Sequence, residues 1–173
     1  MERTGLLQLG GKDVTVIGAD IEVGQQAPEF TQQANDWSSV NVLEATAGKV
    51  RIITALPSLS TGVCDRETRR FNEEATSLSE DIVVVATSTD LPWTQKNWCA
   101  ASGVERVMTV SDSLHGEFGE KYGVLVKERR HFRRAVFVVD ADDKVVYVDY
   151  MKALGDEPNY DEVIEAAKTA LGA

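Results

Sequence analysis

The middle of the chain alternates between buried-strand and amphipathic-helix patterns, and this alternation restricts the possible folds more than any other feature. The β-branched run at residues 49–55 (KVRIITA) predicts a buried strand that ends before Pro57, which has no backbone N–H for a sheet. Apolar residues then recur on one helical face between residues 61 and 80, and residues 81–88 (DIVVVATS) predict a second strand. This order is typical of parallel strands joined by a crossover helix.

The alternation continues toward the C-terminus. Residues 91–101 predict a short helix, because Asp90 and Pro92 are typical of a helix start and Gly103 of a helix end. A strand at residues 104–110 and a short helix at residues 113–121 follow. Further predicted elements are a hairpin of residues 135–139 and 145–150 around the turn at residues 140–143, and an amphipathic helix over residues 160–171.

The N-terminal part has a different pattern. Apolar and polar residues alternate at residues 6–9 and 14–17, on either side of Gly10 and Gly11, and this pattern predicts a hairpin. Residues 24–30 (GQQAPEF) predict a loop, and residues 39–43 predict a short extended segment. We therefore expect one domain over residues 1–173, of the α/β class, with a central mixed sheet flanked by helices and a hairpin extension at residues 1–18. The order suits a thioredoxin-like fold, although pattern alone does not select it over other doubly wound sheets.

Composition excludes several classes of function. The 173 residues are 43% hydrophobic and 27% charged, as in a globular domain. The longest apolar stretches have five residues, and a membrane-spanning helix needs about 20. The 28 acidic and 18 basic residues leave a net charge of -10, which disfavours nucleic-acid binding. The first residues lack the apolar core of a secretory signal, so we expect a cytoplasmic location.

Two cysteines, Cys64 and Cys99, limit the possible redox chemistry. They are too few for a disulfide scaffold, and with two histidines the chain shows no zinc-ligand spacing. Because Cys99 follows 35 residues after Cys64 on another predicted helix, the pair is not a C-x-x-C motif. Two distant cysteines suggest an attacking and a resolving thiol, or two unrelated thiols. A bond between them requires Cα atoms about 4.4 to 6.8 Å apart, so we expect local unwinding of a helix.

Cys64 lies in or just before the first turn of a predicted helix, after the segment PSLSTGV. The free N–H groups and the dipole of a helix start favour a thiolate. Thr61 has a hydroxyl that either caps the helix or hydrogen-bonds beside the sulfur, and Pro57 could fix the loop over it. Asp65 opposes the thiolate unless an arginine compensates, and a lone cysteine is more often a small buried hydrophobe.

A basic run at residues 127–134 (KERRHFRR) holds five of the 18 basic residues. Such a run, with His131, is usually a solvated loop, and an anion-binding patch is the alternative. Arg134 is different because it directly precedes the strand at residues 135–139. From there its guanidinium could reach the edge of the sheet and stabilise a thiolate or a peroxide oxygen. The arginines that follow Cys64 are assigned to solvated surface, and these are Arg66, Arg69 and Arg70.

Pro57, Thr61 and Cys64 match the P-x-x-x-T-x-x-C motif of peroxiredoxins. With RRFN and DLPWTQKNWCAASGV, the chain resembles the thiol peroxidase subfamily, the atypical two-cysteine peroxiredoxins, over residues 6–173. The resemblance implies a thioredoxin-like fold. It also implies that Cys64 is the peroxidatic nucleophile, Cys99 the resolving cysteine, Thr61 the hydroxyl partner, Pro57 the loop proline and Arg134 the active-site arginine. Ser60, where many members carry Asp, and Asp65, where small residues are common, depart from the family pattern.

The resemblance further implies reduction of hydrogen peroxide and organic hydroperoxides to water and alcohols, without metal, haem or flavin. Cys64 would become a sulfenic acid, an intramolecular Cys64–Cys99 disulfide would form, and thioredoxin would reduce it. A homodimer is implied as well. The alternatives are a thioredoxin-like disulfide oxidoreductase, a redox-sensing module, and a domain with two inert cysteines.

Overall fold

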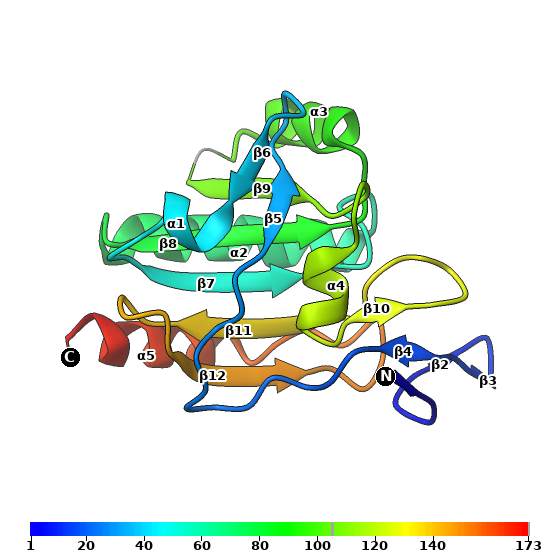
Figure 1. Cartoon of the computed structure of the whole chain (residues 1–173). Coiled ribbons are helices and arrows are strands. Elements are labelled where there is room, and N and C mark those ends of the chain that lie inside the picture. The colour runs from blue at the N-terminus through cyan, green and yellow to red at the C-terminus, as the bar shows by residue number, and fades with distance from the viewer. Residues whose placement is uncertain (105, 173) are drawn as a thin grey trace.

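A mixed sheet of seven strands forms the centre of the molecule (Figure 1). The computed structural model describes residues 1–104 and 106–172, apart from the side chains of residues 75 and 76. In spatial order the strands are β12 (Val145–Tyr150), β11 (Ala135–Val139), β7 (Val50–Ala55), β8 (Ile82–Ser88), β9 (Val107–Ser111), β5 (Thr31–Gln33) and β6 (Ser39–Asn41). The central strands β7, β8 and β9 are parallel, and the outer pairs are antiparallel. The mixed sheet expected from the sequence is confirmed.

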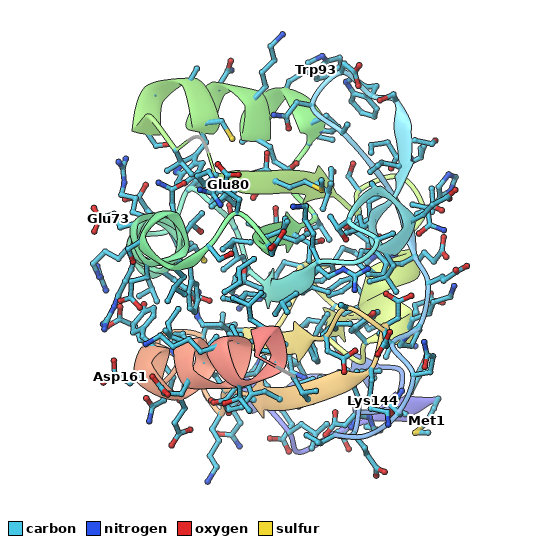
Figure 2. All side chains as sticks on the ribbon, turned by 90° about the vertical axis from the view of Figure 1, so that its left-hand side faces the viewer. Met1, Glu73, Glu80, Trp93, Lys144 and Asp161 are labelled. Atoms are coloured by element: carbon cyan, nitrogen blue, oxygen red, sulfur yellow. The ribbon has the colours of Figure 1, made fainter. Side chains whose placement is uncertain are left out.

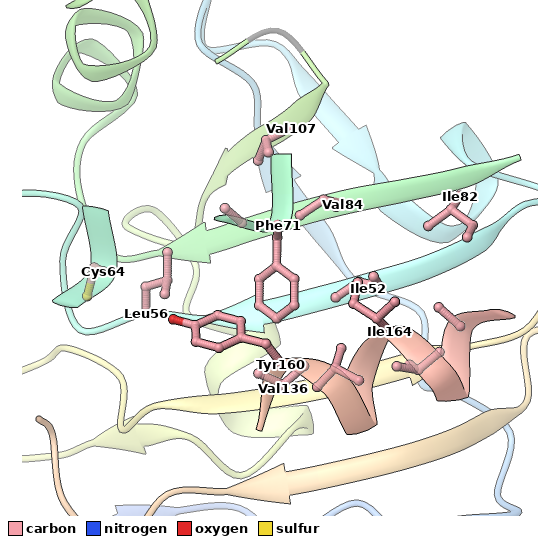
Figure 3. Close-up of a cluster of buried hydrophobic side chains, with 14 of the residues drawn as sticks. Ile52, Leu56, Cys64, Phe71, Ile82, Val84, Val107, Val136, Tyr160 and Ile164 are labelled. Atoms are coloured by element: carbon pink, nitrogen blue, oxygen red, sulfur yellow. The ribbon is translucent and has the colours of Figure 1, made fainter. Parts of the chain in front are cut away.

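Helices cover both faces of this sheet. On one face lie α2 (Gly62–Leu78) and α5 (Tyr160–Leu171), and on the other lie α1 (Val42–Ala45) and α4 (Glu117–Lys121) (Figure 1). Phe71 of α2 and Tyr160 of α5 pack with ring centroids 5.2 Å apart, and Figure 3 shows them over Ile52 and Val136 of the sheet. The remaining helix, α3 (Pro92–Ser102), contacts β9.

The central strands were predictable because both of their faces are buried, so their sequences lack the alternation of apolar and polar residues. All six residues of β7 and all five of β11 are buried, as expected for strands with helices on both faces. The predicted strands at 49–55 and 81–88 begin within one residue of β7 and β8, and the hairpin strands match β11 and β12. Gly103 ends α3 with φ of 68°, a left-handed conformation that glycine adopts without steric cost.

The N-terminal extension differs from the predicted hairpin. β2 (Gln8–Leu9) and β3 (Lys12–Asp13) pair around Gly10 and Gly11 as expected. The rest of the second predicted strand, however, forms β4 (Val16–Ile17), which pairs with β1 (Glu2–Arg3) and β10 (Leu125–Val126). Val16 is fully buried there, and an isolated hairpin has no interior in which to bury it.

Three further differences concern short polar segments. The predicted extended segment 39–43 is a strand only to Asn41, whose side chain accepts a hydrogen bond from Glu44 N and starts α1. β5 has the sequence TQQ and carries no apolar alternation, so it was not predicted. The predicted helix 113–121 begins only at Glu117, because Asp112 accepts hydrogen bonds from Phe118 N and Gly119 N. Glu105, in the predicted strand 104–110, lies outside the described residues.

The topology places both cysteine-bearing helices in one region. α2 follows β7 and α3 follows β8, and the carboxyl ends of parallel strands meet at the same edge of a sheet. The starts of α2 and α3 therefore lie at this edge. Among the described residues, no helix is both long enough and apolar enough to cross a membrane.

Candidate active site

Cys64 is fully buried in the first turn of α2, at one end of the apolar cluster beneath that helix (Figure 3). Thr61 is the N-cap residue: its Oγ1 accepts a hydrogen bond from Cys64 N at 3.4 Å and donates one to Ser58 O at 3.1 Å. Of the two roles expected for Thr61, these contacts correspond to the helix cap. The cap fixes the backbone at Cys64 because it satisfies a donor that the helix itself leaves free.

Arg134 is the residue whose side chain contacts the Cys64 sulfur. Its Nη2 donates to Cys64 Sγ at 3.2 Å and to Leu154 O at 2.9 Å, while Nη1 donates to Glu67 Oε2 at 2.7 Å. Burial opposes the charge of Arg134, but Cys64 and Glu67 outweigh this effect and raise the pKa of Arg134 above its usual value. The guanidinium is therefore a fixed positive charge at the sulfur.

The neighbouring Arg133 makes a different set of contacts. Its Nη2 pairs with Asp20, its Nε donates to Gly123 O at 3.0 Å, and its guanidinium lies 4.1 Å from the Tyr150 ring centroid. Successive side chains of an extended segment point to opposite sides, which explains why only one of the two arginines reaches Cys64. Lys127, at the start of the basic run, pairs with Glu2 at 2.6 Å. The run thus serves several separate contacts.

Glu67 belongs to this cluster and was not singled out from the sequence. It is fully buried one turn after Cys64, and its Oε1 has no hydrogen-bond partner among the described residues. Burial raises the pKa of Glu67 to about 7, although Arg134 favours the charged form. The available signal was its position: residues 64, 67, 68 and 71 share one helical face, and a carboxylate on such an apolar face is rarely unpaired.

Glu67→Gln tests this raised pKa. The pKa of a glutamate carboxyl group is about 4.3 in an unfolded chain. Because the pKa of Glu67 is higher in the folded protein, protonation of Glu67 stabilises the folded state. This stabilisation is complete below about pH 4.3 and is lost as the pH rises through about 7. The free energy of unfolding of Glu67→Gln relative to the wild type should therefore increase by about 2 kcal/mol between pH 5 and pH 8, measured by urea denaturation. Glu165→Gln, at an exposed position on α5, is measured alongside as the control, and a constant difference for Glu67→Gln would contradict the assignment.

A cavity of about 230 Å³ borders the cluster. Arg134 forms part of its wall, together with Pro57, Thr61, Gly62, Val63, Leu154 and Gly155. A water molecule occupies about 30 Å³ in the liquid, so the volume accommodates hydrogen peroxide or a small organic hydroperoxide. The guanidinium thus faces both the sulfur and the space in which a small polar molecule can bind.

Asp90 holds the loop that precedes α2. Its Oδ1 accepts from Ser58 Oγ at 2.7 Å and its Oδ2 from Leu59 N at 2.8 Å. Asp90 was expected to start α3, but the N-cap residue is Leu91, which makes no side-chain cap. The loops after β7 and β8 are neighbours, so the carboxylate reaches across instead. Ser60 lies 2.7 Å (Oγ to Oγ) from Ser58 and extends this network.

Cys99 lies apart from Cys64, and both thiols are free. Its Sγ is 3.3 Å from Thr109 Oγ1, and because that hydroxyl donates to Asn35 Oδ1, the thiol is the donor. Thr109 is in β9 and Arg134 directly precedes β11, two strands separated by β7 and β8. With about 4.8 Å between neighbouring strands, the groups that bind the two sulfurs are anchored about 14 Å apart. A Cys64–Cys99 bond therefore requires displacement of at least one thiol.

The remaining candidates lie outside the cluster. Among the described residues, no three His, Cys, Asp or Glu side chains gather as metal ligands. His131 directs Nδ1 to Phe132 O at 2.9 Å. Arg66, Arg69 and Arg70 are exposed, as expected for solvated surface.

The chain matches the Redoxin family model over residues 22–164. It therefore belongs to the Redoxin family. A thiol peroxidase from Halalkalibacterium halodurans is 48% identical over 161 residues, covering 93% of this chain and 96% of that protein. One from Bacillus subtilis is 47% identical over 161 residues, covering 93% and 95%. Within the family, the chain groups with the thiol peroxidases, as its motifs indicated.

Solved structures show the same fold. A peroxiredoxin-like protein from Aquifex aeolicus superposes with a TM-score of 0.83 at 35% identity and covers 97% of both chains. A thiol peroxidase from Chromobacterium violaceum gives the same TM-score of 0.83 at 20% identity, covering 96% of this chain and 97% of that chain, which supports the fold. The expected thioredoxin-like fold is confirmed.

Proposed function

We propose that the protein is a thiol peroxidase that reduces hydrogen peroxide and small organic hydroperoxides at Cys64. The observation that carries this proposal is the 3.2 Å contact of Arg134 Nη2 with the Cys64 sulfur, beside a cavity of about 230 Å³. A cysteine held by a fixed cation at a capped helix start is an activated nucleophile. The thiol peroxidases that this chain resembles support the same assignment.

In the first step, the Cys64 thiolate attacks the terminal oxygen of the hydroperoxide. A sulfur–oxygen bond forms, the O–O bond breaks, and the leaving alkoxide or hydroxide takes a proton from solvent to become an alcohol or water. Arg134 orients the peroxide and stabilises the charge that develops on the leaving oxygen, a role supported by its contact with the sulfur and its position in the cavity wall. Thr61 fixes the backbone beneath the sulfur, and Pro57 closes one side of the cavity.

In the second step, the Cys99 thiol attacks the Cys64 sulfenic acid, and the sulfenic hydroxyl leaves as water. The product is an intramolecular Cys64–Cys99 disulfide, which protects Cys64 from further oxidation. A dithiol protein of the thioredoxin type then reduces the disulfide by exchange and becomes oxidised itself. Every electron pair comes from thiols, so the chemistry of this cycle needs no cofactor and no metal.

A homodimer and a cytoplasmic location complete the proposal. Large apolar side chains are exposed at the carboxyl edge of the parallel strands, namely Leu91, Trp93 and Leu114, and Trp93 lies at the upper edge of the molecule in Figure 2. Such a patch favours contact with a second copy of the chain. A disulfide that is reduced in each turnover suits a reducing compartment.

An intact-mass and free-thiol measurement tests this function. One equivalent of hydrogen peroxide is added to the reduced protein at neutral pH, and the reaction is quenched after seconds. We expect loss of both thiols and of two hydrogens, in a chain that stays monomeric on a denaturing gel. Survival of both thiols would refute the peroxidase assignment. Light scattering on the same native sample tests the dimer. A particle with the mass of one chain would contradict the dimer.

A further inference from the structure

The helix that carries Cys99 buries few of its side chains. α3 has no side-chain cap at its start, and among its described residues only Pro92 and Gln95 are buried. Trp93, in its first turn, is 61% exposed. A segment with so few buried groups opens at a lower free-energy cost than the core does. The contacts that remain between α3 and its neighbours therefore decide how readily it moves.

Side chains of α2 and α3 form one such contact, here called the α2–α3 tether. Asp65 Oδ1 accepts a hydrogen bond from Trp98 Nε1 at 2.9 Å, and Asp65 Oδ2 accepts one from Arg69 Nε at 2.9 Å. Arg69 Nη1 also donates to Ser102 O at 3.0 Å, and its guanidinium lies 5.9 Å from the Trp98 ring centroid. The tether consists of Asp65, Arg69, Trp98 and Ser102.

Each end of the tether is adjacent to a thiol in the sequence. Asp65 directly follows Cys64, and Trp98 directly precedes Cys99. A disulfide requires the two Cα atoms to come within about 4.4 to 6.8 Å, whereas the sulfurs are now bound to groups anchored about 14 Å apart. At least one thiol must therefore leave its present contact, and movement of either cysteine also moves the adjoining tether residue. The closed tether therefore opposes formation of the Cys64–Cys99 disulfide.

We propose that Asp65, Arg69 and Trp98 are positioning residues that hold the dithiol form closed and thereby set the rate of disulfide formation and the reduction potential. This inference rests on the proposed function. The chemistry remains the condensation of the Cys64 sulfenic acid with the Cys99 thiol, which releases water. The tether acts on the opening that precedes it, so a stronger tether prolongs the lifetime of the sulfenic acid and its exposure to a second peroxide molecule.

Trp98→Phe tests the tether because it removes the indole N–H but keeps an aromatic ring and all charges. The hydrogen bond is partly solvent-exposed, and its loss should increase the rate of disulfide formation about fivefold, measured by rapid quench, alkylation and mass spectrometry. Oxidation of Cys64 to the sulfenic acid should keep the wild-type rate. The reduction potential should become about 20 mV more negative, because only the dithiol form loses a contact. A general loss of stability would affect both redox forms and leave the potential unchanged.

Two other variants complete the experiment. Arg69→Gln breaks the tether at the contacts with Asp65 and Ser102 and should change rate and potential in the same direction. Tyr147→Phe, which removes an aromatic donor to Glu162 between β12 and α5, is the matched control and should behave as the wild type. Wild-type rate and potential in a folded Trp98→Phe or Arg69→Gln protein would overturn the tether while leaving the peroxidase function intact. A wild-type protein that forms no Cys64–Cys99 disulfide would overturn both.

Discussion

The Cys64→Ser variant is expected to reduce no hydroperoxide above the uncatalysed rate, whereas Cys99→Ser should reduce one equivalent and then stop. The difference arises because the first step needs only the Cys64 sulfur and its Arg134 contact. Cys99 is bound to Thr109 in another part of the sheet and takes no part until the sulfenic acid exists. Serine forms no nucleophilic anion at neutral pH. Because its side chain is close in size to that of cysteine, both variants should keep the wild-type fold.

Peroxide consumption in a single-turnover assay, followed by a thioredoxin-coupled assay, separates the two variants. The Cys99→Ser protein should trap one sulfenic acid per chain, detected as an added oxygen by mass spectrometry. It should then show no thioredoxin-dependent turnover. Equal loss of the first round in both variants would contradict the separate roles of the two cysteines.

Arg134→Met is expected to lower the second-order rate constant of Cys64 oxidation by about 10² to 10³, because it removes a preorganised donor at the site of developing charge. Methionine keeps much of the buried volume. The Glu67 carboxyl group then loses its partner, and burial favours its neutral form, so the fold does not retain an uncompensated buried charge. The loss should therefore appear in the chemical step.

Stopped-flow measurement of thiol oxidation in the Cys99→Ser background isolates this step. Arg133→Met is the matched control, since that arginine pairs with Asp20 and contacts Tyr150 without touching the sulfur. It should oxidise at the wild-type rate in samples with native circular dichroism. A loss below about tenfold for Arg134→Met, or an equal loss in the two variants, would remove Arg134 from the reaction.

The predictability of the fold followed from how each element buries its residues. β7 was predicted from a run rich in β-branched residues and β11 from a continuous apolar run, and strands without polar alternation are expected where both faces are covered. β5 was missed because its three residues are polar and because one of its partners, β9, lies far along the sequence. The predicted N-terminal hairpin was correct at its turn, which depends on nearby residues. Its second strand was wrong beyond the turn, because the pairing of β4 with β10 spans most of the chain.

The same distinction applies to the site. The sequence by itself determined what depends on nearby residues: Cys64 in a first helical turn, and Thr61 three positions earlier as its cap. The position of Arg134 directly before a strand singled it out among the arginines. Only the tertiary structure showed that its guanidinium meets the sulfur across 70 residues, that Glu67 joins it, and that Asp65 faces Trp98. Spacing along one helix defines directions within a turn. Contacts between side chains of different elements depend on how those elements pack, and local sequence patterns do not specify this packing.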